Sequence, residues 1–159
     1  MTDKNELRRS LGHFATGVTV VTCRDALGRP CGITVNSFSS VSLEPPLVLW
    51  NIAKVSNSLE AYLNANRFLV NVLAEDQQEL AVHFAKSDHT LFDSVEFELS
   101  PDNIPLLPNA LAHFGCSTYQ VHDCGDHYII VGKIEQFQYR SGNPLLFYGS
   151  RYSALTRTD

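Results

Sequence analysis

The sequence predicts a mainly β protein, an antiparallel barrel closed on itself with helices at its sides. Segments with strand patterns outnumber those with helical patterns, and the predicted helices fall between strands rather than at one end of the chain. No repeat, low-complexity tract or linker divides the 159 residues. A chain of this length buries roughly two thirds of its unfolded surface, so residues 1–159 are expected to form a single domain.

The first part of the chain predicts a helix and a hairpin. Residues 3–15 suit a helix that Gly17 ends. Its apolar residues recur at helical spacing: Leu7, Leu11 and Phe14. The β-branched runs VTVVTCRD and CGITVN flank the turn sequence ALGRP, a pattern typical of a β-hairpin.

The next strand, residues 33–43, is unusually rich in hydroxyl groups. Ile33, Val35, Val41 and Leu43 share one face, which Ser37 and Ser39 interrupt. Thr34, Asn36, Ser40 and Ser42 lie on the other face. A strand that lies against a polar ligand has this composition, and so does a bulged edge strand whose hydroxyls bond to its own backbone. The pattern leaves both open. A Pro-Pro corner then leads into a strand at 46–52.

The remaining elements alternate helices and strands before a long hairpin. Ser56 is expected to cap a helix that runs past Leu63, and a strand at 68–74 follows. The segment EDQQELAVHFAK predicts an acidic-start helix with three inward residues: Leu80, Ala81 and Phe84. Residues 87–109 look like loop. Two long strands turning at 124–126 come next, and PLLFYGSRYSAL predicts a short strand and a tail.

Composition excludes several classes of partner. The net charge of −5 and the pI near 5.6 argue against binding nucleic acid through bulk charge, so any anionic ligand must be held locally. The charged N-terminus has no apolar run fit for a signal peptide and no segment suits a membrane span, so a cytoplasmic protein is expected. The four cysteines lack a CxxC pair and are expected to stay thiols. Cys124 and His127 have ligand-like spacing but no second pair, so no metal is expected.

Two local patterns suggest a binding site. Ser56, Asn57 and Ser58 after Lys54 suit a phosphate cradle at a helix N-terminus, although a simple N-cap is the commoner case. In CGDHY, the histidine begins a strand after a turn and can bond a ligand or only water. No nucleophile or second base lies beside it, so an acyl-transfer triad is poorly supported.

The order of these pieces resembles a known family. FATGVTVVT, GITVNSFSSVSLEPPLV, SNSLEAYL, FLVNVL, ELAVHFA, GDHYIIVGKI and PLLFYGSRYSAL together are similar to the flavin reductases that supply reduced flavin to two-component monooxygenases. The resemblance spans residues 7–155. Its most specific elements are the serine-rich strand before Pro-Pro and the Gly-Asp-His turn.

The resemblance implies an FMN-binding split β-barrel, a Greek-key antiparallel barrel with flanking helices. It implies a homodimer that binds FMN or FAD between subunits and reduces it with NADH or NADPH. One segment would then lie along the flavin ring and ribityl chain, with hydroxyl and N–H groups toward the ring edge that gains negative charge on reduction. Its members are Thr34, Asn36, Ser37, Phe38, Ser39 and Ser40.

The family likewise implies roles for residues elsewhere in the chain. The phosphate would sit near Ser56 and Ser58 with Lys86 as counter-charge and Lys54 as a second candidate. Phe84 would join the flavin site. His127 and Tyr152 would place the nicotinamide, and Phe14 would cover the ring. Hydride then passes from nicotinamide C4 to flavin N5 between stacked rings, with no protein acid or base required.

The sequence leaves three identities open. No arginine cluster selects a 2′-phosphate and no familiar adenine motif is present, so neither the pyridine nucleotide nor the flavin is fixed. The partner monooxygenase and its substrate cannot be named. Two other classes of protein remain as alternatives: a flavin-binding electron carrier on the same barrel, and a non-catalytic barrel that binds another planar ligand.

Overall fold

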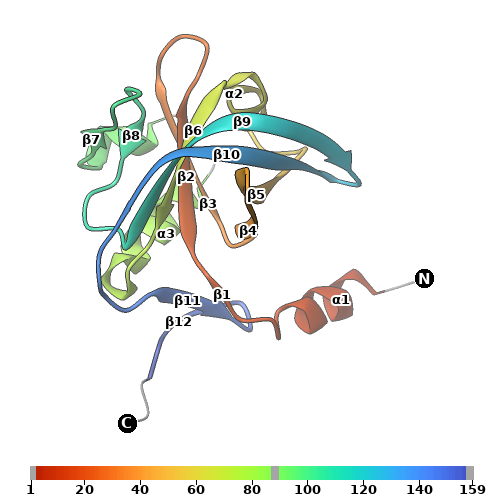
Figure 1. The fold of residues 1–159 in the computed structure, drawn as a ribbon. Helices are drawn as coiled ribbons and strands as arrows, with labels where there is room; N and C mark the ends of the chain where they lie inside the picture. Colours follow the sequence, from red (N-terminus) through yellow and green to blue (C-terminus); the bar gives the residue numbers. More distant parts are fainter. Residues whose placement is uncertain (1–2, 87–89, 157–159) are drawn as a thin grey trace.

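The computed structural model describes residues 3–86 and 90–156 and is mainly β (Figure 1). The largest sheet has seven antiparallel strands. Their order across the sheet is β3 (Pro30–Val35), β2 (Thr19–Arg24), β6 (Arg67–Val72), β9 (Ala112–Cys124), β10 (His127–Tyr139), β5 (Pro46–Ala53) and β4 (Ser39–Leu43). The hairpin of β2 and β3 and the long hairpin of β9 and β10 confirm the sequence prediction.

The seven-stranded sheet curls like a barrel but is not closed by hydrogen bonds. Its two edges are β3 and β4, which follow each other in the chain with only residues 36–38 between them. A link of this length spans at most about 14 Å, and the two edges must therefore lie near each other. The contacts between β3 and β5, the neighbour of β4, agree with this (Figure 1). The prediction of a closed barrel is therefore wrong in one respect. Residues 36–38, here called the crossing segment, connect the two edge strands at the place where hydrogen bonds between β3 and β4 would close the barrel.

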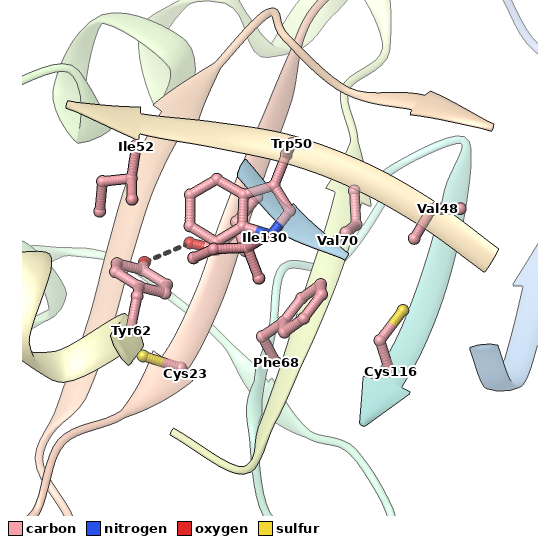
Figure 2. Close-up of a cluster of buried hydrophobic side chains, with 10 residues drawn as sticks. Cys23, Val48, Trp50, Ile52, Tyr62, Phe68, Val70, Cys116 and Ile130 are labelled. Atoms are coloured by element: carbon pink, nitrogen blue, oxygen red, sulfur yellow. Dashed lines mark hydrogen bonds between the residues drawn. The ribbon is translucent and has the colours of Figure 1, made fainter. Parts of the chain in front are cut away.

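The concave side of the sheet holds the main core (Figure 2). Trp50 stands there between Tyr62 and Phe68, with ring centroids 5.0 and 5.9 Å away. Tyr62 comes from α2 (Leu59–Asn64), and its hydroxyl donates to the Val21 carbonyl at 2.6 Å. Fully burying each such large apolar side chain contributes about 1.5–3 kcal/mol, so this cluster fixes the curl of the sheet.

A second core joins the main sheet to a smaller one. The small sheet has the order β1 (Thr16–Gly17), β11 (Leu145–Tyr148) and β12 (Arg151–Ala154). The helix α3 (Gln78–Phe84) packs Ala81 and Phe84 into this core, as predicted. Phe84 lies so close to β3 that a Cβ at Gly32 would stand 2.7 Å from its ring. The position therefore requires glycine.

The remaining described elements are short. A 3₁₀ helix at Glu75–Gln77 precedes α3, and another covers Leu91–Ser94. Strands β7 (Glu98–Leu99) and β8 (Pro105–Leu106) pair within the region expected to be loop. All four cysteines are free thiols, as expected. No helix in the described parts of the chain is long and apolar enough to cross a membrane.

Three boundaries differ from the predictions. The first helix, α1 (Lys4–Leu11), ends at Gly12 rather than Gly17, because the Gly12 carbonyl accepts from the Gly149 N–H at 2.9 Å and ties this point to the β11–β12 turn. The expected strand at 33–43 is two strands separated by the crossing segment. The expected C-terminal tail contains β12, which pairs with β11.

Candidate functional site

An open cleft of about 850 Å³ lies beside the crossing segment. Organic ligands are usually held in pockets of roughly 300–1,000 Å³, so its size suits one. The lining comes from α1 and the segment after it, from the crossing segment, from strands β1, β4, β5 and β11, and from the β11–β12 turn: Arg8, Leu11, Gly12, Phe14, Ala15, Thr16, Gly17, Asn36, Ser37, Phe38, Ser39, Asn51, Phe147 and Ser150. Five predicted site residues therefore meet here: Phe14, Asn36, Ser37, Phe38 and Ser39.

The crossing segment is fixed at two points. The Ser37 hydroxyl accepts a hydrogen bond from the Asn51 N–H at 2.9 Å, which ties the segment to β5. The Phe38 ring stacks on Phe114 of β9, with centroids 5.8 Å apart and planes at 18°. Both anchors use long-range contacts, so the wall of the cleft is held by the folded sheet rather than by local structure.

Two residues of the cleft lining each carry a buried polar atom without a partner. Thr16 Oγ1 and Asn51 Oδ1 are closed to solvent and make no hydrogen bond within the described residues. Leaving such an atom unsatisfied costs about 1–3 kcal/mol, so a ligand that pairs with both would gain binding energy. Sequence reasoning missed both residues. Asn51 could have been noticed as the single amide in the apolar run PLVLWNIA, whereas no feature of the sequence around Thr16 marks it as a site residue.

Two other hydroxyls of this stretch donate to backbone carbonyls. Thr34 donates to the Ala81 carbonyl at 2.7 Å and links β3 to α3. Ser39 donates to the Ser40 carbonyl at 3.1 Å, on the exposed edge strand β4, whose pairing shifts register between Ser40 and Ser42. The bulged edge strand that the composition left open is therefore present in β4, while Asn36 and Ser37 face the cleft.

The predicted phosphate cradle is arranged differently from expectation. The helix α2 has Ser58 rather than Ser56 as its N-cap residue, and Ser56 Oγ instead accepts from the Ser58 N–H at 3.3 Å, in the preceding turn. Lys54 is bound elsewhere, because its Nζ lies 2.6 Å from Asp123 Oδ1 and 5.2 Å from the centre of the Tyr128 ring. The bond with Asp123 raises the pKa of Lys54.

A separate pocket of about 250 Å³ lies next to Ser58. Arg29 and Cys31 line it too, and the Arg29 Nε pairs with Asp25 Oδ2 at 2.7 Å. Sequence reasoning missed Arg29 as a cation near Ser58. Lys86 lies just beyond α3, exposed, and its N–H donates to the His83 carbonyl at 3.3 Å.

The last three predicted residues occupy different parts of the fold. Phe84 is fully buried in the second core and has no surface at the cleft. Tyr152 packs against the cleft residue Phe147, with centroids 5.2 Å apart, and burial raises the pKa of Tyr152. His127 is outside the cleft lining, at the start of β10, where its Nδ1 lies 2.7 Å from Asp126 Oδ1 and holds the pKa of that carboxyl down.

These features define a class of protein: a split β-barrel with a cleft, large enough for an organic ligand, beside the crossing of its two edges. In the described chain, no three His, Cys, Asp or Glu side chains are grouped to hold a metal ion. The chain matches the family model "Flavin reductase like domain" over residues 11–156. It belongs to this family, which confirms the resemblance seen in the sequence.

Several known proteins are similar to this chain over most of their own length, although the chain spans less than half of some other relatives. The chain is 43% identical to the FMN reductase (NADH) SmoA of Agrobacterium fabrum, over 98% of this chain and 88% of that protein. It is 41% identical to the reductase subunit HsaB of a flavin-dependent monooxygenase from Rhodococcus jostii, covering 96% and 78% of the two chains. Among solved structures, the NADH:FAD oxidoreductase SgcE6 of Streptomyces globisporus, in complex with NAD and FAD fragments, superimposes with a TM-score of 0.92 at 36% identity, covering 97% of this chain and 93% of that one.

Proposed function

We propose that this protein reduces a flavin, FMN or FAD, with NADH in the cleft beside the crossing segment. The observation that carries the proposal is the meeting of the predicted flavin segment with two unpaired buried polar atoms in one cleft. Family membership and the names of the relatives support the reaction and favour NADH over NADPH.

The chain's own residues would bind and orient the two rings. Asn51 Oδ1 is a free acceptor for a ring N–H, and the Thr16 hydroxyl is a free donor for a ring carbonyl or nitrogen. Donors fixed at the ring edge favour the reduced flavin, because that edge gains negative charge. Phe14, 79% exposed at the cleft, would cover the stacked rings. Flavin supplies the hydride acceptor and nicotinamide the donor, so the protein's role is alignment.

The phosphate and the nicotinamide would use residues outside the cleft lining. The predicted set of Ser56, Ser58 and Lys86 lies toward α2 and α3, and Arg29 adds a cation beside Ser58. Arg8 on α1 supplies a positive charge at the cleft for an anionic part of NADH. His127 and Tyr152 keep the role that the family resemblance implies for them, which is to position the nicotinamide.

We infer that the working form is a homodimer. The helix α1 has no buried residue and stands away from the sheets (Figure 1). Leu11 at the end of α1 is 66% exposed, Phe14 just after the helix is mostly exposed, and both line the cleft. A second copy of the chain would cover this apolar surface and wall the open side of the cleft, which fits the family expectation of flavin between subunits.

The product would serve a separate monooxygenase. Relatives are named as reductase subunits or components of flavin-dependent monooxygenases. Reduced flavin can reach such a partner by diffusion, so no docking surface is required for this role.

The test is NADH oxidation by flavin-free protein, with and without added FMN, FAD or riboflavin. Steady oxidation that depends on added flavin is expected, and it separates a reductase from a carrier that turns over once on a bound flavin. Asn51→Ala should weaken flavin binding about 10-fold, as loss of one buried hydrogen bond does. The matched Asn66→Ala, exposed in the loop between α2 and β6, should leave binding unchanged. No flavin-dependent oxidation with any of the three flavins would overturn the proposal.

A further inference from the structure

Two cysteines of the first hairpin face each other across the strands. Cys23 of β2 is the direct antiparallel partner of Cys31 of β3. Directly opposite residues project to the same face with Cα atoms about 4.5–5.5 Å apart, inside the 4.4–6.8 Å range that a disulfide needs. The Cα spacing of the pair therefore suits a disulfide.

The two thiols differ in access. Cys23 is fully buried at the edge of the main core, near Tyr62 (Figure 2). Cys31 is only partly buried and lines the pocket beside Ser58. A small oxidant from solvent therefore reaches Cys31 first.

The thiols also differ in acidity. A hydrogen bond between them raises the pKa of Cys23 and lowers the pKa of Cys31. Arg29 lowers the pKa of Cys31 further, whereas burial and Asp25 oppose the shift. The thiolate is the form that attacks peroxides, so the accessible member of the pair is also the more reactive one.

We propose that Cys31 and Cys23 form a peroxide-responsive thiol–disulfide pair within one chain. The Cys31 thiolate attacks one oxygen of hydrogen peroxide, and the O–O bond breaks. Cys31 becomes a sulfenic acid, and the hydroxide that is released takes up the proton that the Cys31 thiol had lost, which gives the first water molecule. The Cys23 sulfur then attacks the Cys31 sulfur, the S–O bond breaks, and the Cys23 proton leaves with the hydroxide as water. In sum, two thiols and one peroxide give one disulfide and two water molecules.

The oxidant has a source close to the site. Reduced flavin that meets oxygen instead of a monooxygenase returns to oxidised flavin and yields hydrogen peroxide. This source rests on the proposed function, whereas the reactivity of the pair does not. The protein would then be exposed to peroxide whenever its product is not consumed.

The other two cysteines serve as internal controls. Cys116 is buried, burial raises its pKa to about 12, and its neighbours across the two ladders are Phe68 and Ile134 rather than a cysteine. Cys124 is exposed, but its opposite neighbour across the ladder is His127 rather than a cysteine. Peroxide should therefore leave Cys116 as a thiol and give Cys124 no partner within the chain.

The test treats reduced, flavin-free protein with a few equivalents of hydrogen peroxide, alkylates the remaining thiols and digests with trypsin. Cleavage after Arg24 separates the two cysteines into peptides 10–24 and 25–54. The expected product is a disulfide that joins these two peptides, forms in most of the protein and disappears with a reductant. Cys124→Ser should keep this product and Cys31→Ser should lose it, with Cys23 left reduced.

Three results would overturn the proposal: a sulfenic or sulfinic acid on Cys31 with no cross-link, a cross-link between two chains, or oxidation of Cys23 in Cys31→Ser. A second arm supplies NADH, flavin and oxygen in place of peroxide. Formation of the same disulfide, blocked by catalase, supports the reaction as the source of oxidant. NADH consumption without the disulfide rejects that source. Absence of NADH consumption, with the disulfide still formed by added peroxide, rejects the proposed function alone.

Discussion

Ser37 Oγ accepts a hydrogen bond from the Asn51 N–H at 2.9 Å, and the Asn51 side chain in turn holds an unpaired oxygen in the cleft. This contact joins the crossing segment to β5 and places both residues on the cleft lining. The geometry of the candidate flavin site therefore depends on one hydroxyl that bonds to a backbone 14 residues away.

Ser37→Ala should loosen this wall of the cleft. Loss of one hydrogen bond is expected to lower the free energy of unfolding by about 1 kcal/mol and to weaken flavin binding several-fold. Urea denaturation and flavin titration measure the two effects. Ser42→Ala, on the bulged edge strand β4, is the matched control and should change neither. Unchanged flavin affinity in Ser37→Ala would show that the anchor does not shape the site.

Lys86→Ala tests the phosphate site. If Lys86 pairs with the phosphate, the substitution should weaken FMN by about 1.5–3 kcal/mol, as expected for a charge-assisted hydrogen bond, and riboflavin much less. Titrations with both flavins measure the difference. Arg29→Ala is a parallel variant, because Arg29 lines the pocket beside Ser58. Equal losses for FMN and riboflavin in Lys86→Ala would place the phosphate elsewhere.

His127→Ala separates hydride transfer from flavin binding. If His127 orients the nicotinamide, flavin affinity should stay nearly intact while the reduction rate at saturating NADH falls, because a shift of ~1 Å can cost about 100-fold. Anaerobic stopped-flow at the flavin absorbance band measures the rate. If His127 only shapes the turn beside Asp126, the variant loses thermal stability and keeps its rate per folded molecule.

Leu11→Glu should disrupt the inferred homodimer. A carboxylate on the exposed apolar side of α1 would have to be desolvated in the interface, so the variant is expected to sediment as a monomer at micromolar concentration. Leu27→Glu is a matched control, because Leu27 is 77% exposed but lies on the β2–β3 loop. A wild-type chain that is monomeric and still binds flavin tightly would contradict the inference.

His113 should make stability depend on pH. Its Nε2 donates to the Leu107 carbonyl at 2.8 Å and its Nδ1 accepts from Gln138 at 3.1 Å, so the neutral ring satisfies both contacts. Burial lowers the pKa of His113 from 6.5. The unfolded chain then binds a proton that the folded chain does not, so this stabilisation is complete above about pH 6.5 and is lost as pH falls through the folded pKa.

Denaturation at a series of pH values measures this effect. The free energy of unfolding should fall less steeply below pH 6.5 in His113→Gln than in the wild type. His122→Gln is the control, because His122 is exposed and makes only a side-chain contact with Gln120. Parallel pH profiles for the wild type and His113→Gln would contradict the assignment.

The sequence by itself determined the local elements and the family. The β-branched runs around ALGRP predict the β2–β3 hairpin, and the turn at 124–126 predicts the β9–β10 hairpin. The helical spacing of Ala81 and Phe84 predicts which side of α3 is buried. The ordered motifs identified the family, and residues 36–39 of the segment that the resemblance assigns to flavin line the cleft. Such features depend on residues close together in the chain, so a single sequence carries them.

Only the tertiary structure decided which residues line the cleft and which of their polar atoms are unpaired. The two sheet edges meet because the core around Trp50 curls the sheet, and residues as distant in sequence as Phe14, Asn51 and Ser150 line the same cleft. The side-chain oxygens of Thr16 and Asn51 lack a hydrogen-bond partner because the fold buries them away from water. Lys54 forms an ion pair with Asp123, which is 69 residues away in the sequence. No local periodicity encodes contacts at that separation, because they depend on how distant strands pack rather than on the preferences of neighbouring residues.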